Sequence, residues 1–237
     1  MTVSFRNGRY LARLAISTAD VMACQSLRHR CFFGADGRDV DSFDKVWSHM
    51  MVEDGAAGPL VCTFRLRESV SVEIINGYAG QFYDLEKLSK TDGPHIEIGR
   101  FCTDPATPDP HILRVAWGAL TGIVDGCAAT VLFGCTSFEG VDPVPYAGVI
   151  QKLVLSHLGP QELMPAQSAI ETVMLDDVLV GAEKRPMPPL LRTYLAMGGW
   201  VSDHAVIDRA LHTLHVLTVV EIAKIPPARA KSLRALV

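Results

Sequence analysis

The chain has 237 residues, of which 49% are hydrophobic and 20% charged, and its formal net charge is −4 at pH 7. This composition is typical of a folded globular protein and excludes a disordered chain. The negative charge argues against a general nucleic-acid-binding protein, so we expect no nucleic-acid partner.

The cysteines form no CxxC pair and have no spacing with histidine that suits zinc. We therefore expect reduced thiols in a cytoplasmic protein, and no metal site. No uncharged apolar run approaches the roughly 20 residues that span a bilayer, so any membrane contact should be peripheral. The six cysteines are Cys24, Cys31, Cys62, Cys102, Cys127 and Cys135.

The first part of the chain predicts a strand, a helix and a hairpin. Residues 10–16 are typical of a strand, and Thr18 is the expected N-cap of a helix over 19–32, where apolar residues recur at helical spacing. An acidic loop over 34–44 follows. Residues 46–54 and 58–66 then predict two antiparallel strands.

The remainder predicts alternating helices and strands. Residues 82–88 resemble a short polar helix, and 95–103 a strand; Asp109 should cap a helix that begins at Pro110. We also expect strands over 130–138 and 211–222, and helices from Tyr146 and over 188–200. With no internal repeat or convincing linker, this order predicts one α/β (α+β) domain over 1–237.

The segment EIGRFCTDP, residues 97–105, places two charges within an apolar run. Side chains three apart in a regular strand point to opposite faces, but a bulge near Gly99 would bring Glu97 and Arg100 to one face. The pair is then either a structural ion pair or the edge of a site. The next helix offers the N–H groups of His111 and Ile112, which suit a phosphate. No Gly-rich phosphate loop is present.

The acidic loop allows two interpretations. Asp39, Asp41 and Asp44 follow Arg28 and Arg30, and these carboxylates lie either in a solvated loop or in a cluster that holds a cationic amino substrate. The spacing lacks the glycine and glutamate of a calcium loop. Neither HExxH nor GxSxG occurs, so metal and serine hydrolase chemistry have little support.

Six ordered motifs carry a family resemblance over about residues 20–205. They are LRHRCFF, DVDSFD, VCTFRL, EIGRFCTDP, VLFGCTSFEGVDP and RPMPPLLRTYLAMGGWV. Together they resemble the bacterial ornithine lipid N-acyltransferases. This group is similar to the acyl-homoserine lactone synthases, and both belong to the GCN5-related N-acetyltransferase fold. The resemblance implies a twisted mixed sheet with splayed central strands and flanking helices.

The resemblance also implies an activity. Such an enzyme moves a 3-hydroxyacyl chain from acyl carrier protein to the α-amine of L-ornithine and gives lyso-ornithine lipid. It would be cytoplasmic, with peripheral contact at the inner face of the inner membrane. The polar positions that match the family are Arg28, Asp41, Asp44, Arg65, Glu97 and Arg100.

One departure from the wider fold concerns the donor. Coenzyme A enzymes carry a glycine-rich loop where this chain has PATPDPH, residues 105–111. This favours a phosphopantetheine arm and no tightly bound cofactor. The expected donor-binding residues are His111 and Ile112, through their N–H groups, with Arg114 and Lys152.

The chemistry requires a base, because an α-ammonium of pKa roughly 7.7–8.0 must lose its proton before attack. We expect Glu97 to be this base, oriented by Arg100 or with Arg100 binding the acceptor carboxylate. Tyr146 is either the acid for the leaving thiolate or a core residue. No covalent intermediate is required, so Cys102 and Cys135 are expected to be packing residues.

Three alternatives remain open. The acceptor could be glutamine or glycine, or the enzyme could make a lactone signal from S-adenosylmethionine. A catalytically dead protein could instead dock a carrier protein or a lipid. Asp41 and Asp44 would suit an ornithine ammonium, or they could only brace Arg28 and Arg65.

Overall fold

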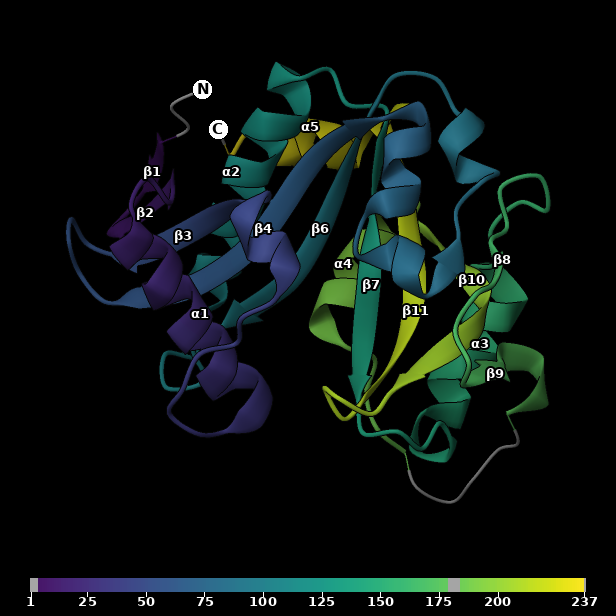
Figure 1. The fold of residues 1–237 in the computed structure, drawn as a ribbon. Helices are drawn as coiled ribbons and strands as arrows, with labels where there is room; N and C mark the ends of the chain where they lie inside the picture. The colour runs from purple at the N-terminus through teal and green to yellow at the C-terminus, as the bar shows by residue number, and fades with distance from the viewer. Residues whose placement is uncertain (1–3, 179–183, 237) are drawn as a thin grey trace. The chain divides into compact units, whose positions relative to one another are not determined.

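The computed structural model describes residues 4–178 and 184–236. The chain divides into two compact units. The first comprises residues 1–68, 98–129 and 227–237, and the second comprises 69–97 and 130–226. Strand β6 (Pro94–Thr103) begins in the second unit and ends in the first (Figure 1).

The strands of the first unit follow the order β1-β2-β3-β4-β6, and the pairs β1–β2, β2–β3 and β3–β4 are antiparallel. The predicted hairpin is confirmed, since Ser48 pairs with Leu66 and Val52 with Cys62. Helix α2 packs on β1, β2 and β3, and α1 packs on β3. The elements are β1 (Ser4–Asn7), β2 (Tyr10–Leu14), α1 (Thr18–Phe33), β3 (Ser48–Asp54), β4 (Leu60–Val70), α2 (Pro110–Gly126) and α5 (Pro227–Arg234).

Helix α1 begins one residue earlier than predicted. Its N-cap is Ser17, not Thr18: Ser17 Oγ accepts from the Asp20 N–H at 3.1 Å, and the Asp20 carboxylate accepts from the Ser17 N–H at 3.2 Å. This reciprocal pair forms a capping box, which requires the acidic residue three positions after the cap. The spacing of Ser17 and Asp20 therefore determines where helix α1 begins.

The predicted start of α2 is confirmed. Asp109 is its N-cap and Pro110 its first residue. Its apolar stripe, including Ile112, Val115 and Ala119, is buried. The packing of this stripe against the strands of the first unit fixes the position of α2 and of its N-terminus.

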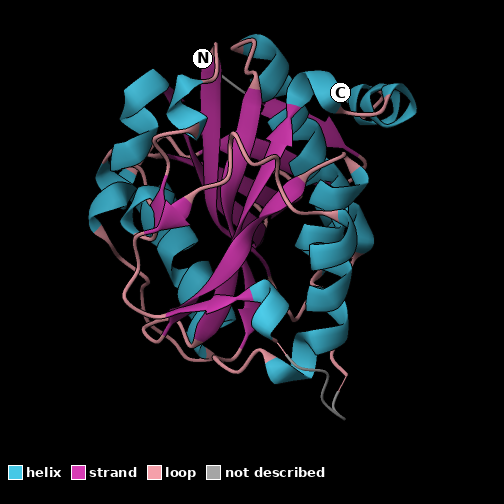
Figure 2. Cartoon of the chain, turned by 90° about the vertical axis from the view of Figure 1, so that its right-hand side faces the viewer, coloured by secondary structure: helices cyan, strands magenta, loops and turns pink. Residues whose placement is uncertain are grey.

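The second unit holds a mixed sheet in the order β6-β7-β11-β10-β9. β6 is parallel to β7, and the other pairs are antiparallel. This confirms the expected α/β class with helices against strands (Figure 2). The elements are β5 (Tyr83–Asp84), β7 (Val131–Glu139), α3 (Ala147–Ser156), β8 (Ala166–Gln167), β9 (Thr172–Met174), α4 (Pro189–Ala196), β10 (Trp200–Asp208) and β11 (Thr213–Glu221).

Two cores lie on the two faces of this sheet, because alternate residues of β11 belong to different clusters. Leu217 and Val219 pack with the 74–88 segment, whereas Leu214 and Val216 pack with α3 and α4. Alternation of side chains along a strand requires this division. The sheet is therefore covered on both faces.

Two expectations about this unit were wrong or incomplete. Residues 82–88 form no helix: β5 pairs with β8, and a 3-10 helix follows at Leu88–Lys90. Tyr83, Leu85 and Leu88 are all buried, and this tertiary packing overrides the helical pattern. Strand β10 was not predicted, and Trp200, expected at the end of a helix, is its first residue. None of the helices within 4–178 and 184–236 is long and apolar enough to cross a membrane.

Candidate active site

Arg28 is the centre of a buried ion-pair network in the first unit. Its side chain, on α1, has no exposed surface. Its Nε lies 2.9 Å from Asp39 Oδ2, and its Nη1 and Nη2 donate to the two oxygens of Asp44 at 2.8 and 2.9 Å. A bidentate pair of this kind fixes both the position and the orientation of the guanidinium.

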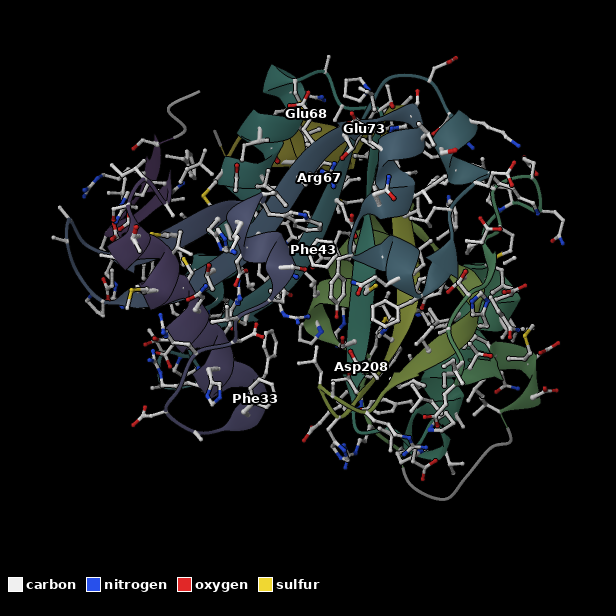
Figure 3. The ribbon with its side chains drawn as sticks, in the orientation of Figure 1. Phe33, Phe43, Arg67, Glu68, Glu73 and Asp208 are labelled. Carbon is white, nitrogen blue, oxygen red and sulfur yellow. The ribbon has the colours of Figure 1, made fainter. Side chains whose placement is uncertain are left out.

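Arg65, from β4, completes the same network and is also fully buried. Its Nη1 and Nη2 donate to Asp41 at 2.5 and 2.7 Å, and Nη1 lies 2.9 Å from Asp44 Oδ1. Its guanidinium carbon lies 5.1 Å from the ring centre of Trp47 and 5.5 Å from that of Phe43, which is labelled in Figure 3. Aromatic faces favour a cation at this range.

The loop that carries the carboxylates is held by its own capping box. Asp41 caps the 3-10 helix Ser42–Lys45, accepting from the Phe43 N–H at 2.9 Å, while Asp44 accepts from the Asp41 N–H. Burial raises the pKa of Asp44, but the hydrogen bonds and charges of Arg28 and Arg65 outweigh burial and place this pKa well below its usual range. Burial and Arg65 oppose each other in the same way at Asp41, and the net effect lowers its pKa.

The interpretation of this segment as a solvated acidic loop is therefore wrong. Asp39 and Asp44 retain only 7% and 8% of their exposed surface, because three arginines pair with them and with Asp41. The alternative in which the carboxylates brace Arg28 and Arg65 matches the geometry. Asp41, whose side chain is 23% exposed, is the most accessible of the three.

Arg100 joins the network from β6, and its backbone is unusual. Its φ is 55°, in the left-handed region, directly after Gly99, where the sequence predicted a bulge. The bulge itself stays a prediction. Arg100 Nε donates to Asp39 at 2.9 Å, and Nη2 lies 3.4 Å from Asp41. Five of the six polar family positions thus meet in one unit, together with Asp39, which the sequence placed in the acidic cluster but not among the family positions.

Glu97, the sixth position, lies in the second unit and is 2% exposed. Its Oε1 accepts from the Ala79 N–H at 2.6 Å. A Cβ built on Gly77 would lie 1.9 Å from its Oε2, so only glycine leaves room for this carboxylate. Nothing in the sequence identified residues 77–79 as neighbours of Glu97. Pairing of Glu97 with Arg100 stays a prediction.

The predicted phosphate site at the start of α2 is already occupied by a side chain. Asp109 Oδ1 accepts from the His111 N–H at 2.8 Å, and the Ile112 N–H bonds the Asp109 carbonyl. Asp109 Oδ2 also accepts from the Tyr10 hydroxyl at 2.8 Å. The His111 N–H bond and the Tyr10 hydroxyl lower the pKa of Asp109. A phosphate would have to displace this carboxylate.

The two basic donor-site residues lie in different units. Arg114 is exposed on α2 in the first unit, and Lys152 is exposed on α3 in the second. Lys152 lines a cavity of about 360 Å³ together with three other basic side chains. The structure therefore gives Lys152 cationic neighbours that the sequence pattern did not show.

Tyr146 and two cysteines were weighed for chemistry. Tyr146 is 5% exposed in the core beside Phe138, and its hydroxyl donates to the Glu139 carbonyl at 3.2 Å, so the core interpretation is confirmed. Cys102 is buried, and a hydrogen bond with Cys31 together with burial raises its thiol pKa well above the usual range. A thiol in this state is a poor nucleophile. Cys135 packs against the core of the second unit.

Within residues 4–178 and 184–236, no three His, Cys, Asp or Glu side chains are grouped so that they could hold a metal ion. The arginine–aspartate network instead offers charge and rigid hydrogen-bond donors. Such a network can position polar substrate groups without rearranging during the reaction.

Comparison with known proteins gives these features a family context. An acetyltransferase (GNAT) domain model matches residues 27–118, which include all six polar family positions. The L-ornithine N(alpha)-acyltransferase of Brucella abortus is 30% identical over 93% of this chain and 87% of its own length. That of Rhizobium meliloti is 30% identical over 90% and 80%. A solved structure of FeeM, an N-acyl amino acid synthase from uncultured soil microbes, shares the fold with a TM-score of 0.55 at 10% identity, over 92% of this chain and 94% of its own.

Proposed function

Because this chain belongs to the family of L-ornithine N(alpha)-acyltransferases, we propose that it transfers a 3-hydroxyacyl chain to the α-amine of L-ornithine, giving lyso-ornithine lipid. The observation that carries this proposal is the 30% identity over 93% of the chain. The match of an acetyltransferase (GNAT) domain model to residues 27–118, the range that holds these buried polar positions, supports it. The whole of 1–237 would then act as one acyltransferase domain.

The reaction forms an amide and breaks a thioester. The amine nitrogen attacks the acyl carbonyl carbon, the C–N bond forms, and the C–S bond breaks to release the thiol. Glu97 is the proposed base that removes a proton from the ammonium, directly or through a water. Its buried carboxylate, held by the Ala79 N–H, supports this role because its orientation is fixed.

The arginine–aspartate network is the proposed acceptor site. Arg100 is 10% exposed, and its planar guanidinium suits the acceptor carboxylate. Asp41, the most accessible carboxylate, suits the side-chain ammonium of ornithine. Arg28, Arg65 and Asp44 would hold these two groups in place. Glutamine or glycine as acceptor would make no use of Asp41.

The proposed donor is an acyl carrier protein whose phosphopantetheine arm carries the acyl chain, with no tightly bound cofactor. Arg114 is an exposed cation on α2 that suits an acidic partner. Binding of the arm's phosphate by the N–H groups of His111 and Ile112 requires Asp109 to move away from them. Assistance by Lys152 is a further part of this proposal.

We also infer that the enzyme works in the cytoplasm and touches the inner face of the inner membrane from the side. Its product carries a long acyl chain and a charged head, so release into a bilayer avoids exposing apolar surface to water. Helices or loops on the surface of the folded protein would make this contact.

Mass spectrometry of products tests the activity. Purified full-length protein is incubated with 3-hydroxyacyl carrier protein and, separately, L-ornithine, glutamine, glycine or S-adenosylmethionine. An N-acyl product with ornithine supports the proposal, and a product with another amino acid reassigns the acceptor. A lactone from S-adenosylmethionine would make it a signal synthase. No product from folded protein would favour a binding protein that lacks catalysis.

A further inference from the structure

The cavity that contains Lys152 brings four basic side chains of the second unit together. It has a volume of about 360 Å³, and its lining residues come from 145–152, around the start of α3, and from 184–192, which lead into α4. Among residues 4–178 and 184–236, no acidic side chain lines it. Its basic residues are Lys152, Lys184, Arg185 and Arg192.

Three of the four basic side chains have no acidic partner among the residues that the structure describes. Arg185 lies 3.6 Å from Glu139, whose side chain is 87% exposed. In the part of the chain that the structure describes, Lys152, Lys184 and Arg192 have no carboxylate within 4 Å. Like charges repel when brought together, so a group of this kind is stabilised by a bound anion.

The cavity walls are held by the backbone. The Arg185 N–H donates to the Pro145 carbonyl at 2.8 Å, which ties the segment before α4 to the segment before α3. Arg192 Nη2 donates to the Met187 carbonyl at 3.3 Å. The cations are therefore presented by connected chain segments of one unit.

Exposed apolar side chains flank the cations. Leu155 is 77% exposed and follows Lys152 by three residues on α3, so the two share one helix face. Val144, which is 41% exposed, directly precedes Pro145 of the cavity. Cations beside exposed aliphatic side chains are typical of surfaces that lie in a membrane interface.

We propose that this cavity binds the phosphate headgroups of anionic phospholipids and that Leu155 and Val144 enter the adjoining bilayer interface. This inference rests on the peripheral membrane contact proposed above and names the surface that makes it. Lys152 would then contact lipid phosphate in place of the donor's phosphate. Lys and Arg donate charge-assisted hydrogen bonds to phosphate oxygens. An anionic leaflet attracts each nearby cation, which makes affinity depend on the number of basic residues and on salt.

Sedimentation with vesicles tests the surface without any acyl transfer. Full-length protein is mixed with vesicles of phosphatidylcholine alone or of phosphatidylcholine and phosphatidylglycerol in equal parts. Wild-type protein should bind the anionic vesicles more tightly. Lys184→Glu and Arg192→Glu should each lower this affinity at least about fivefold, as expected from the loss of one cation near a charged leaflet. Lys231→Glu, with the same charge change on exposed α5, should have little effect.

Folding of each variant is checked by circular dichroism, and Arg192→Gln replaces Arg192→Glu if the latter fails to fold. Leu155→Ser should weaken the part of vesicle binding that persists in high salt, because salt screens the charges but not the apolar contact. Equal binding to both vesicle types, or equal losses in all three charge variants, would overturn the proposal. So would unchanged vesicle binding with a raised KM for the acyl carrier protein, since the cavity would then dock an acidic protein. Acyl-transfer activity is measured separately, so its failure does not affect this outcome.

Discussion

Arg28 and Arg65 share one oxygen atom of Asp44, with Arg28 Nη1 at 2.8 Å and Arg65 Nη1 at 2.9 Å from Oδ1. The two guanidinium groups come from α1 and β4, so this single carboxylate links a helix to a strand that the sequence separates by 37 residues. Two buried cations this close would repel each other without the shared anion. Asp44 is therefore central to the stability of the first unit.

Replacing Asp44 with Asn should lower the free energy of unfolding by about 3–5 kcal/mol, because it leaves buried arginine charge without its partner. The change is measured by urea denaturation. Asp36→Asn, an exposed position in the same acidic loop, serves as the control and should change stability little. Equal effects of the two substitutions would contradict a structural role of the network.

The same carboxylates should make the protein sensitive to acid. The folded pKa of Asp44 is depressed below its ordinary value of 3.8, so its contribution is fully present above that pH and is lost as the pH falls further. Burial lowers the pKa of His49 below 6.5, so stability should already decline as the pH falls through 6.5. Urea denaturation from pH 7 to pH 3 checks both. The difference in the free energy of unfolding between wild type and Asp44→Asn should become smaller only below about pH 4.

At Arg100, two substitutions separate the effect of the backbone conformation on stability from the effect of the side chain. Arg100→Ala and Arg100→Gly both remove the ion pairs with Asp39 and Asp41. Only glycine accepts a φ of 55° without strain, so the glycine variant should be more stable than the alanine variant by about 1 kcal/mol. Thermal and urea denaturation of the two variants give this difference. An alanine variant as stable as the glycine variant would argue against the left-handed conformation.

The sequence predicted local features where the signal is local. The helix over 19–32 and the Asp109–Pro110 start each depend on a few adjacent residues, and both are confirmed within one residue. The prediction of a helix over 82–88 was wrong. The conformation of this segment depends on the packing of Tyr83, Leu85 and Leu88 against strands that lie far away in the sequence.

The site was predicted less completely, for the same reason. The resemblance supplied six polar positions, but their pairing depends on loops that converge only in the fold. The sequence grouped Asp39 with Asp41 in the acidic loop, but it did not predict the ion pairs of Asp39 with Arg28 and Arg100. The role of Gly77 could not be predicted from the sequence. Gly77 matters because a side chain there would collide with Glu97, which lies 20 residues later in the chain.

The proposed base is tested by Glu97→Gln, which keeps the size of the side chain and an oxygen that can accept from the Ala79 N–H. Loss of a general base should reduce kcat by about 10²- to 10⁴-fold while folding is preserved. Turnover is measured as release of free thiol from 3-hydroxyacyl carrier protein in the presence of ornithine. Glu162→Gln, an exposed position of the same unit, should keep full activity. A fully active Glu97→Gln would rule out Glu97 as the base.

Gly77→Ala should impair the reaction without altering any polar group. Its backbone φ of −77° suits alanine, but the added Cβ would lie 1.9 Å from Glu97 Oε2, so the carboxylate must move. Because small displacements of a reacting group are costly, kcat should fall roughly tenfold to a hundredfold. Gly122→Ala is the matched control: its Cβ meets nothing within 4 Å in the middle of α2, and alanine there should raise stability by about 1 kcal/mol. If Gly77→Ala folds and turns over like Gly122→Ala, then the position of the Glu97 carboxylate does not limit catalysis.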